Sequence, residues 1–339
     1  MITGLKLNNF TAFKNLDLVL SPGINVFLGE NGTGKTHVLK VMYSACDIMK
    51  TNMNFAEKLI RNFLPSKRSL GRMVHRQKKS ANCKVIVSRY DNANLTLSFT
   101  NHGKRAKDAT IKGEREWISK PTNSVYIPVK EMLSNGPGFR SLYSQREIHF
   151  EEIYSDILDR AYLPVARGPI ENQRKQLLER LQKVIDGRVS IVNEEFFLKN
   201  KQGNLEFTLL AEGIRKLGLL WQLIQNGTLL GGSILFWDEP ETNLNPDLYN
   251  ALINILLELQ RCGVQIFLAT HNYVILKELD FCKTSNDKVA YHSLFRDSNS
   301  KELVCQTTED YLQIDPNLIA NTFNGLYDRE IERSLFGRK

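Results

Sequence analysis

The stretch from Gly29 to Thr36 constrains the fold of this chain more than any other, because it matches the pattern G-x-x-x-x-G-K-[ST]. The five residues before it, Ile24 to Leu28, are typical of a buried strand, and residues 37–50 carry apolar side chains at helical spacing. A strand, a glycine loop and a helix in this order form a cradle whose backbone N–H groups bind a phosphate chain. The alternative is a glycine-rich turn that happens to contain Lys-Thr, and it would need this order to be a coincidence.

The residue types in this loop suit a nucleoside triphosphate and a magnesium ion. Lys35 can reach the β- and γ-phosphates, and the Thr36 hydroxyl can hold Mg²⁺. We therefore expect ATP and Mg²⁺ as ligands. The further candidate nucleotide contacts in and beside the loop are Asn31, Gly32, Thr33, Gly34 and His37.

Composition excludes several classes of protein. The chain has 339 residues, 42% of them hydrophobic and 24% charged, as in ordinary globular proteins. No apolar run approaches the roughly 20 residues needed to cross a bilayer, and the first residues lack the pattern of a secretion signal. Five scattered cysteines without a C-x-x-C pair indicate neither a disulfide framework nor a cysteine zinc site. We expect a cytoplasmic protein without a membrane partner.

The positive charge of the chain, net +8, is concentrated between residues 58 and 89. This segment contains no acidic residue. Such a block either binds nucleic acid or another acidic surface, or is a solvated loop, and the sequence favours neither. Its basic residues are Lys58, Arg61, Lys67, Arg68, Arg72, Arg76, Lys78, Lys79, Lys84 and Arg89.

The order of elements predicts three parts. Residues 1–130 hold antiparallel strands at 2–7 and 16–20, the phosphate loop, the basic segment, a hairpin of 85–87 with 95–99, and a strand at 125–128. Residues 131–200 are rich in helix formers broken by prolines and predict a small helical lid without the heptads of a coiled coil. A hairpin of 196–199 with 205–209 leads into the third part, residues 201–339, which then holds a helix from about 211 and the segments described next.

Two apolar strands predicted in this last part end in polar residues, which we call polar tips. Residues 233–237 form a strand that ends in Asp238 and Glu239, where Asp238 would hold Mg²⁺ and Glu239 would orient the attacking water. Residues 264–270 form another, and His271 at its tip can donate to the γ-phosphate. The alternatives are acids that cap a helix and a structural histidine. A hairpin of 289–295 with 302–307 and a charged helix from about Pro316 complete the chain.

The opening strands and phosphate loop, together with Asp238-Glu239-Pro240-Glu241 and Asn243-Leu244-Asn245-Pro246, resemble the ATPase heads of the SMC, RecF and ABC-type families. The pattern looks most like the small AAA-type, SMC-like ATPases of bacterial anti-phage and toxin modules. This resemblance implies an α/β fold of the ABC-type P-loop NTPase head, with a mixed central sheet, flanking helices, N-terminal antiparallel strands and a small helical lid.

The same resemblance implies a site shared between two subunits. Ala211, Glu212 and Gly213 stand where those families have the signature turn, and Asn243 lies in the loop that lines the dimer seam. Both would contact a nucleotide held by the opposite subunit. A homodimer or higher homo-oligomer is therefore expected, together with a separate effector protein.

Three other functions are compatible with parts of the pattern. A RecF-like DNA-repair ATPase fits the N-terminal pattern and the basic segment. A nucleotide-binding subunit of a membrane transporter is disfavoured by the changed signature turn, by the absence of a Gln after strand 125–128 and by the middle insertion. An OLD-type nuclease would need a nuclease domain after His271, and we expect any cleavage to come from a partner instead.

Overall fold

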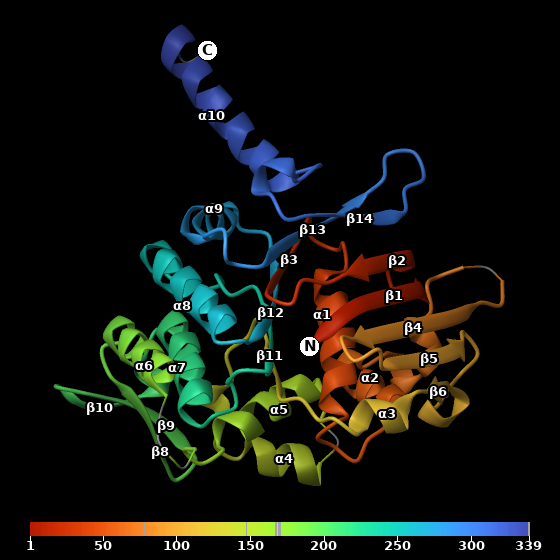
Figure 1. The fold of residues 1–339 in the computed structure, drawn as a ribbon, viewed down its shortest axis with the longest axis horizontal. Helices are drawn as coiled ribbons and strands as arrows, with labels where there is room; N and C mark the ends of the chain where they lie inside the picture. The colour runs from red at the N-terminus through yellow and green to blue at the C-terminus, as the bar shows by residue number, and fades with distance from the viewer. Residues whose placement is uncertain (78, 147, 167, 169–170, 338–339) are drawn as a thin grey trace.

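A six-stranded sheet carries the phosphate loop and both polar tips. The computed structural model describes residues 1–77, 79–146, 148–166, 168 and 171–337. The strand order is β14-β13-β3-β12-β11-β7, and all neighbours are parallel except β13 and β14. The predicted mixed central sheet is confirmed (Figure 1). Its strands are β3 (Ile24–Leu28), β7 (Ser124–Ile127), β11 (Ile234–Asp238), β12 (Gln265–Thr270), β13 (Val289–Arg296) and β14 (Leu303–Thr308).

The central strands are apolar throughout because both faces of the sheet are covered. In β3, Ile24, Val26 and Leu28 belong to one hydrophobic core, whereas Phe27 belongs to a second core on the opposite face. Adjacent side chains of a strand point to opposite faces, so a strand between two cores has no polar face. Because β3, β11 and β12 are parallel, their carboxyl ends meet at one edge, where α/β sheets bind ligands.

The N-terminal antiparallel sheet packs over one face. Its order is β2-β1-β4-β5-β6. The predicted strand pair at the start of the chain is confirmed but longer than expected, because Phe10 pairs with Phe13 and only Thr11 and Ala12 form the turn. The predicted hairpin of β4 with β5 is also confirmed. The strands are β1 (Ile2–Phe10), β2 (Phe13–Val19), β4 (Asn82–Arg89), β5 (Asn94–Thr100) and β6 (Thr110–Lys112).

Helices cover both faces of the central sheet (Figure 1). On the side of the antiparallel sheet lie α1 (Lys35–Asp47), α2 (Phe55–Phe63) and α3 (Glu114–Ile118). On the other side lie α7 (Glu212–Gln225), α8 (Tyr249–Arg261) and α9 (Tyr273–Cys282). The sequence did not predict α9, which Asn272 caps by accepting the N–H groups of Val274 and Ile275.

The segment 131–200, expected to be a helical lid, is helical only in its first part. It holds α4 (Phe139–Gln145), α5 (Glu152–Ala161) and α6 (Asn172–Val184). A three-stranded sheet follows, with β8 (Arg188–Val192), β9 (Glu195–Asn200) and β10 (Gly203–Glu206). In β9, Phe196 and Leu198 are buried and their neighbours are more exposed, which is the two-residue period of a strand.

The last helix, α10 (Leu318–Phe336), stands away from the body of the molecule (Figure 1). Only its first turns pack on α9, where the rings of Tyr273 and Phe323 stack with centroids 4.5 Å apart. In the part of the chain that the structure describes, no helix has the length and apolarity to cross a membrane. The described residues also form the short 3₁₀ turns η1 (Ser66–Arg68), η2 (Leu70–Met73), η3 (Ala106–Asp108), η4 (Leu133–Asn135), η5 (Phe207–Leu209), η6 (Pro246–Leu248) and η7 (Tyr311–Gln313).

Candidate nucleotide site

The phosphate loop joins β3 to α1 and has the shape of a cradle. Gly29, Gly32 and Gly34 all have positive φ values, of 143°, 81° and 84°. At Gly34 a Cβ atom would also come within 2.7 Å of the Phe13 ring. A side chain at this position would therefore both clash with Phe13 and strain the backbone. The turn brings the first N–H groups of α1 to the sheet edge, where the positive end of the helix dipole favours an anion.

Lys35 lies inside the cradle. Its Nζ donates to the carbonyl oxygens of Gly29 and Glu30 at 2.7 and 2.9 Å, and only 7% of the residue is exposed. Burial lowers the pKa of Lys35, and the nearby carboxylates of Glu239 and Asp238 act in the opposite direction. An ammonium group held at this place can bind a phosphate chain that lies along the loop.

Thr36 and Asp238 come together as predicted. The Thr36 hydroxyl donates to Asp238 Oδ1 at 3.2 Å, and the phenol of Tyr126 donates to Oδ2 at 3.1 Å. Burial raises the pKa of Asp238, and both hydrogen bonds oppose that shift. Among the described residues no group of three His, Cys, Asp or Glu side chains could hold a metal. One hydroxyl and one carboxylate instead fit Mg²⁺, which usually takes one or two carboxylates together with substrate phosphates and waters.

Glu239 and His271, predicted from different strands, also meet. His271 Nδ1 lies 3.0 Å from Glu239 Oε1, and the Thr242 hydroxyl donates to Oε2 at 3.2 Å. Glu239 has a left-handed backbone, with φ 48°, and its N–H donates to Ala269 O of β12. The carboxylate is therefore fixed from two sides while a quarter of the side chain stays exposed. A carboxylate held in this way can orient a water molecule.

The neighbouring acid, Glu241, has a different environment. It is 5% exposed and accepts a 2.5 Å hydrogen bond from the Thr270 hydroxyl. Burial raises the pKa of Glu241. It therefore connects β12 to the loop after β11 and is buried, whereas a quarter of the Glu239 side chain is exposed.

The signature turn packs against the seam loop of the same chain. The carboxylate of Glu212 accepts from the Asn243 amide at 2.8 Å. Gly213 is buried, and a Cβ atom there would lie 2.7 Å from Asn243 O and 2.9 Å from Leu244 Cα. The glycine is thus needed for packing within the chain. Ala211, in contrast, is exposed at the start of α7.

Neither cation that follows the turn pairs with Glu212 through a direct contact. Arg215 Nε lies 2.9 Å from a carboxylate oxygen of Glu131, and Lys216 Nζ donates to Thr242 O at 2.8 Å. Burial lowers the pKa of Lys216, with Glu212 and Glu241 opposing that shift. Within the described residues, no hydrogen bond or ion pair joins Ala211, Glu212, Gly213 or Asn243 to the phosphate loop.

A hollow of about 460 Å³ lies beside the phosphate loop. His37 and Thr11 line it, and His37 Nδ1 and Thr11 Oγ1 are buried without a hydrogen-bond partner among the described residues. Burial lowers the pKa of His37 to about 4, so its ring is neutral at pH 7. The predicted contact residue His37 thus lines a hollow whose other walls are Ala12, Phe63, Pro65, Ser66, Arg72, Met73, Val74, His75 and Arg76.

The remaining predicted loop residues lie where the motif requires. Asn31 and Gly32 are exposed at the rim, and the Thr33 hydroxyl donates to Glu30 O at 2.8 Å inside the loop. The sequence did not predict Tyr126 and Thr242 as site residues. Tyr126 lies in the predicted strand 125–128, but only the pairing of β7 with β11 brings its phenol to Asp238.

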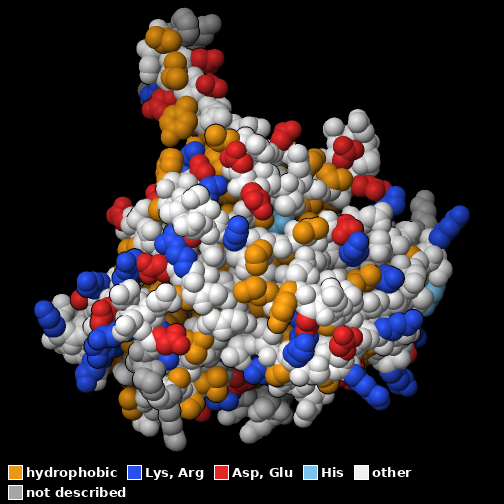
Figure 2. All heavy atoms as spheres, in the orientation of Figure 1, with side chains coloured by type: hydrophobic (Ala, Val, Ile, Leu, Met, Phe, Trp, Pro, Cys, Tyr) orange, Lys and Arg blue, Asp and Glu red, His pale blue; other side chains and the backbone are white. Residues whose placement is uncertain are grey.

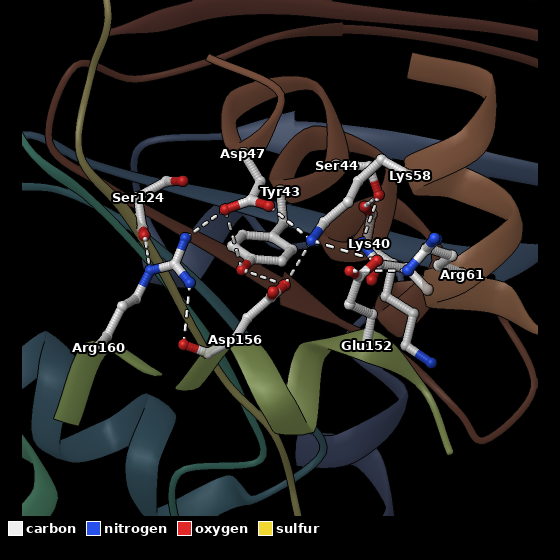
Figure 3. Close-up of polar contacts among 11 residues, drawn as sticks. Lys40, Tyr43, Ser44, Asp47, Lys58, Arg61, Ser124, Glu152, Asp156 and Arg160 are labelled. Carbon is white, nitrogen blue, oxygen red and sulfur yellow. Dashed lines mark hydrogen bonds and ion pairs between the residues drawn. The ribbon is translucent and has the colours of Figure 1, made fainter. Parts of the chain in front are cut away.

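The basic segment 58–89 does not form one exposed surface, because the residues at its two ends are buried. Lys58 is fully buried on α2, and its Nζ lies 2.6 Å from Asp47 and 2.7 Å from Asp156 (Figure 3). Arg89, at the other end, is 4% exposed and pairs with Asp91. Lys78 lies outside the described residues. The exposed basic residues of the segment are Arg61, Lys67, Arg68, Arg72, Arg76, Lys79 and Lys84.

The ionic cluster around Lys58 holds the phosphate-loop helix α1 to α2 and α5. Asp47 on α1 and Asp156 on α5 both contact Lys58, and Arg160 on α5 contacts Asp47 (Figure 3). The Tyr43 phenol donates to Asp156 at 2.7 Å. Burial opposes the charge on Asp47, yet Arg160 and Lys58 keep the pKa of this carboxyl below its ordinary value. The cluster thereby joins α1, α2 and α5 near the C-terminal end of α1.

Comparison with known proteins agrees with this geometry. The chain is 27% identical over 199 residues to the DNA replication and repair protein RecF of Listeria welshimeri. The aligned region covers 58% of this chain and 50% of the relative. The chain thus spans about half the length of the curated relatives it matches. The fold is similar to an SMC head bound to the C-winged helix domain of ScpA, with TM-score 0.57 and 13% identity over 92% of this chain and 99% of the other.

A second SMC head domain, from Thermotoga maritima, has TM-score 0.50 and 13% identity over 91% of this chain and 99% of the other. The fold of this chain is therefore that of the SMC head domains. A family model described as "AAA domain, putative AbiEii toxin, Type IV TA system" matches residues 56–277, more than half of the chain. With its phosphate loop, acid pair and histidine assembled on one sheet edge, the chain belongs to this family of P-loop ATPases.

Proposed function

We propose that this protein is a Mg²⁺-dependent ATPase that closes as a head-to-tail dimer around two ATP molecules and controls a separate effector, in bacterial anti-phage defence. The observation that carries the proposal is the convergence of the three strand ends of β3, β11 and β12. It places Lys35, the Thr36–Asp238 pair and the Glu239–His271 pair at one edge. These are the groups that phosphoryl transfer to water needs.

Each group has a role that its surroundings support. Lys35 and the loop N–H groups would hold the phosphates, and the hollow that His37 and Thr11 line beside the loop would take the base or sugar. Thr36 and Asp238 would hold Mg²⁺, which supplies charge neutralisation for the phosphates when bound. Glu239, positioned by His271 and Thr242, would orient the attacking water and take up its proton.

We infer the dimer from the side of the γ-phosphate that one subunit does not cover. Lys35, Asp238 and Glu239 lie together at one sheet edge, whereas Ala211 is exposed at the start of α7, and no hydrogen bond or ion pair of the described residues joins it to the phosphate loop. A γ-phosphate surrounded on both sides excludes water and strengthens each electrostatic contact. The turn at Ala211 is therefore expected to cover the nucleotide of the partner subunit.

Mixing two inactive variants tests this composite site. Lys35→Ala is expected to abolish ATP binding, and Ala211→Glu to block hydrolysis by placing a second carboxylate beside Glu212 against the phosphates of the partner. A mixture should regain part of the steady-state ATPase activity, because a mixed dimer rebuilds one intact site. Ala211 is suitable because it is exposed, whereas Gly213 could not be changed without disturbing Asn243 and Leu244.

Two controls make the mixing experiment decisive. Mixing Lys35→Ala with Glu239→Gln should give no recovery, since both changes lie on the same side of the site. Full activity of Ala211→Glu by itself would refute the shared site, while the assignment of Lys35 to ATP binding would still stand on direct nucleotide titration.

The effector part of the proposal is supported by the family and by a structural neighbour. The family description names a toxin system, and the SMC head of similar fold was solved bound to a domain of ScpA. An ATPase head of this kind can act by holding a partner in one nucleotide state and releasing it in another.

A RecF-like DNA-binding ATPase is the second candidate, favoured by the 27% identity to RecF. Exposed Lys67, Lys79 and Lys84 lie in the basic segment outside the hollow beside His37. If the segment binds duplex DNA, changing these three residues to Glu should weaken binding and reduce the log–log salt slope by roughly one unit for each phosphate that is no longer neutralised.

Fluorescence anisotropy with a labelled DNA duplex, over a series of salt concentrations, measures this slope. Changing Arg188, Lys199 and Lys201 of the β8–β10 sheet to Glu alters the charge equally and serves as the control. Equal slopes for the wild type and the variant at Lys67, Lys79 and Lys84 would leave the segment as a solvated surface.

A further inference from the structure

The carboxylate of Asp238 is buried, so the chain itself must hold it in place. Figure 2 shows Asp and Glu side chains on the surface of the molecule, where water can bond both carboxylate oxygens. Asp238, in contrast, is 4% exposed at the end of β11. A buried carboxylate keeps one orientation when protein groups donate to its oxygens. The donors to Asp238 therefore decide which of its oxygens is available to a ligand.

The two oxygens of Asp238 have donors from two different elements. Thr36, at the start of α1, donates to Oδ1 at 3.2 Å, and Tyr126 in β7 donates to Oδ2 at 3.1 Å. Among the described residues these two hydroxyls are the donors to this side chain, and the nearby ammonium of Lys40 pairs with Glu151 at 2.6 Å. Thr36 and Tyr126 together therefore set the orientation of the carboxylate.

Packing fixes the ring of Tyr126 and thereby aims its hydroxyl. The residue is 1% exposed, and its ring centroid lies 5.4 Å from that of Tyr43 on α1. In the parallel pairing of β7 with β11, Tyr126 lies opposite Phe236, whose ring also packs against Tyr43 at 6.0 Å. The hydroxyl is thus held by contacts to the phosphate-loop helix and to the strand that ends in Asp238.

The two hydroxyls have different tasks in the expected metal site. A hydroxyl that binds Mg²⁺ uses a lone pair, so Thr36 can still donate its proton to Oδ1. The phenol of Tyr126 is protonated at neutral pH and donates to the other oxygen, Oδ2. Oδ1 is thereby the oxygen of Asp238 that stays beside Thr36 at the phosphate loop.

We propose that Tyr126 is a positioning residue of the metal site, which holds Oδ2 of Asp238 so that Oδ1 faces Thr36 and thereby sets the affinity for Mg²⁺. This inference rests on the proposed ATPase function, because it takes Thr36 and Asp238 as the residues that hold the ion. Mg²⁺ demands near-ideal octahedral geometry, so a carboxylate that is free to rotate lowers its affinity. Removing a group that orients a metal ligand typically costs about 10- to 100-fold in metal affinity or activity.

Manganese binding to the nucleotide complex tests the proposal without relying on hydrolysis. Mn²⁺ takes the same oxygen ligands as Mg²⁺, and its electron paramagnetic resonance signal separates free from bound ion. The non-hydrolysable analogue AMP-PNP is kept below the protein concentration, so that free nucleotide does not compete for the metal. Tyr126→Phe removes only the hydroxyl, and should raise the dissociation constant for Mn²⁺ by about tenfold or more. Its affinity for AMP-PNP in EDTA should equal that of the wild type, because Lys35 and the loop are unchanged.

Tyr43→Phe is the matched control. The phenol of Tyr43 is also buried, but it donates to Asp156 at 2.7 Å and not to Asp238. Thermal unfolding reports the stability of both variants, and Tyr43→Phe should keep the Mn²⁺ affinity of the wild type whatever its unfolding temperature. An unchanged dissociation constant in Tyr126→Phe would overturn the proposal. An equal rise in both variants would also overturn it, because packing of the rings would then set the affinity.

A fluorine label provides a second measurement that keeps every contact, should Tyr126→Phe not fold. With 3-fluorotyrosine in place of Tyr126, the fluorine resonance should shift when Mg²⁺ is added to the AMP-PNP complex, whereas the same label in place of Tyr43 should not respond. A label at Tyr126 that does not respond to Mg²⁺ would overturn the positioning role. Failure of the proposed function is recognised separately, because the wild type would then bind no AMP-PNP with or without metal, and this inference would fall with it.

Discussion

Changing Glu239 to Gln is expected to slow ATP hydrolysis by about a hundredfold or more, the usual effect of removing a general base. The amide keeps the size of the carboxylate but cannot accept a proton from water. Its contacts to His271 and Thr242 position the group without supplying the lost basicity. Single-turnover hydrolysis of radiolabelled ATP and equilibrium ATP binding, measured in parallel, should show a lost rate and retained affinity.

Glu241→Gln is the matched control for this experiment. Glu241 is two residues away but buried, and it accepts a hydrogen bond from the Thr270 hydroxyl that the oxygen of an amide can also accept. Hydrolysis by this variant should stay close to that of the wild type. If Glu239→Gln hydrolysed ATP at the wild-type rate, the assignment of Glu239 as the water-orienting group would fail.

Glu239→Gln also provides the state in which to look for the effector. A variant that binds ATP without hydrolysing it keeps the proposed dimer closed for longer. Products of neighbouring genes, co-expressed with this variant and with Lys35→Ala, should co-purify with only one of the two. Equal recovery with both would show that the partner does not respond to the nucleotide.

Replacing Lys58 with Met is expected to destabilise the protein by about 3–5 kcal/mol, as is usual when one partner of a buried ion pair is removed. Lys58 is fully buried, and Asp47, Glu152 and Asp156 lie within 3.5 Å of its Nζ. These acids raise the pKa of Lys58 although burial opposes its charge. Without the ammonium, the surplus negative charge would stay buried between α1, α2 and α5.

Urea unfolding followed by circular dichroism measures this change. Lys6→Met is the control, because Lys6 pairs with Asp17 at 2.7 Å with both side chains more than half exposed. An exposed pair contributes at most about 1 kcal/mol, so this variant should unfold close to the wild type. Equal midpoints for both variants would mean that the cluster around Lys58 does not hold the three helices together.

Local pattern was sufficient to predict the parts of the site that belong to strand ends. Residues 24–28 and 234–238 are apolar because both faces of the sheet are covered, and that burial also places Lys35, Asp238 and His271 at one edge. The motif further predicts the glycines of the loop, since a positive φ and a close contact at Gly34 exclude other residues. The sequence alone therefore determined the fold class and most of the proposed nucleotide contacts.

Only the tertiary structure decided which charges are available for binding. In sequence, Lys58 and Lys79 belong to one basic run, yet α2 places Lys58 against acids from α1 and α5, and Lys79 is exposed. Those acids are distant along the chain, and no local pattern indicates that they meet. The same holds for Tyr126 on Asp238 and for Gly213 against Asn243, because each depends on how two separate elements pack. Periodicity records which face of an element is buried, whereas the identity of the neighbour on that face is set by the fold as a whole.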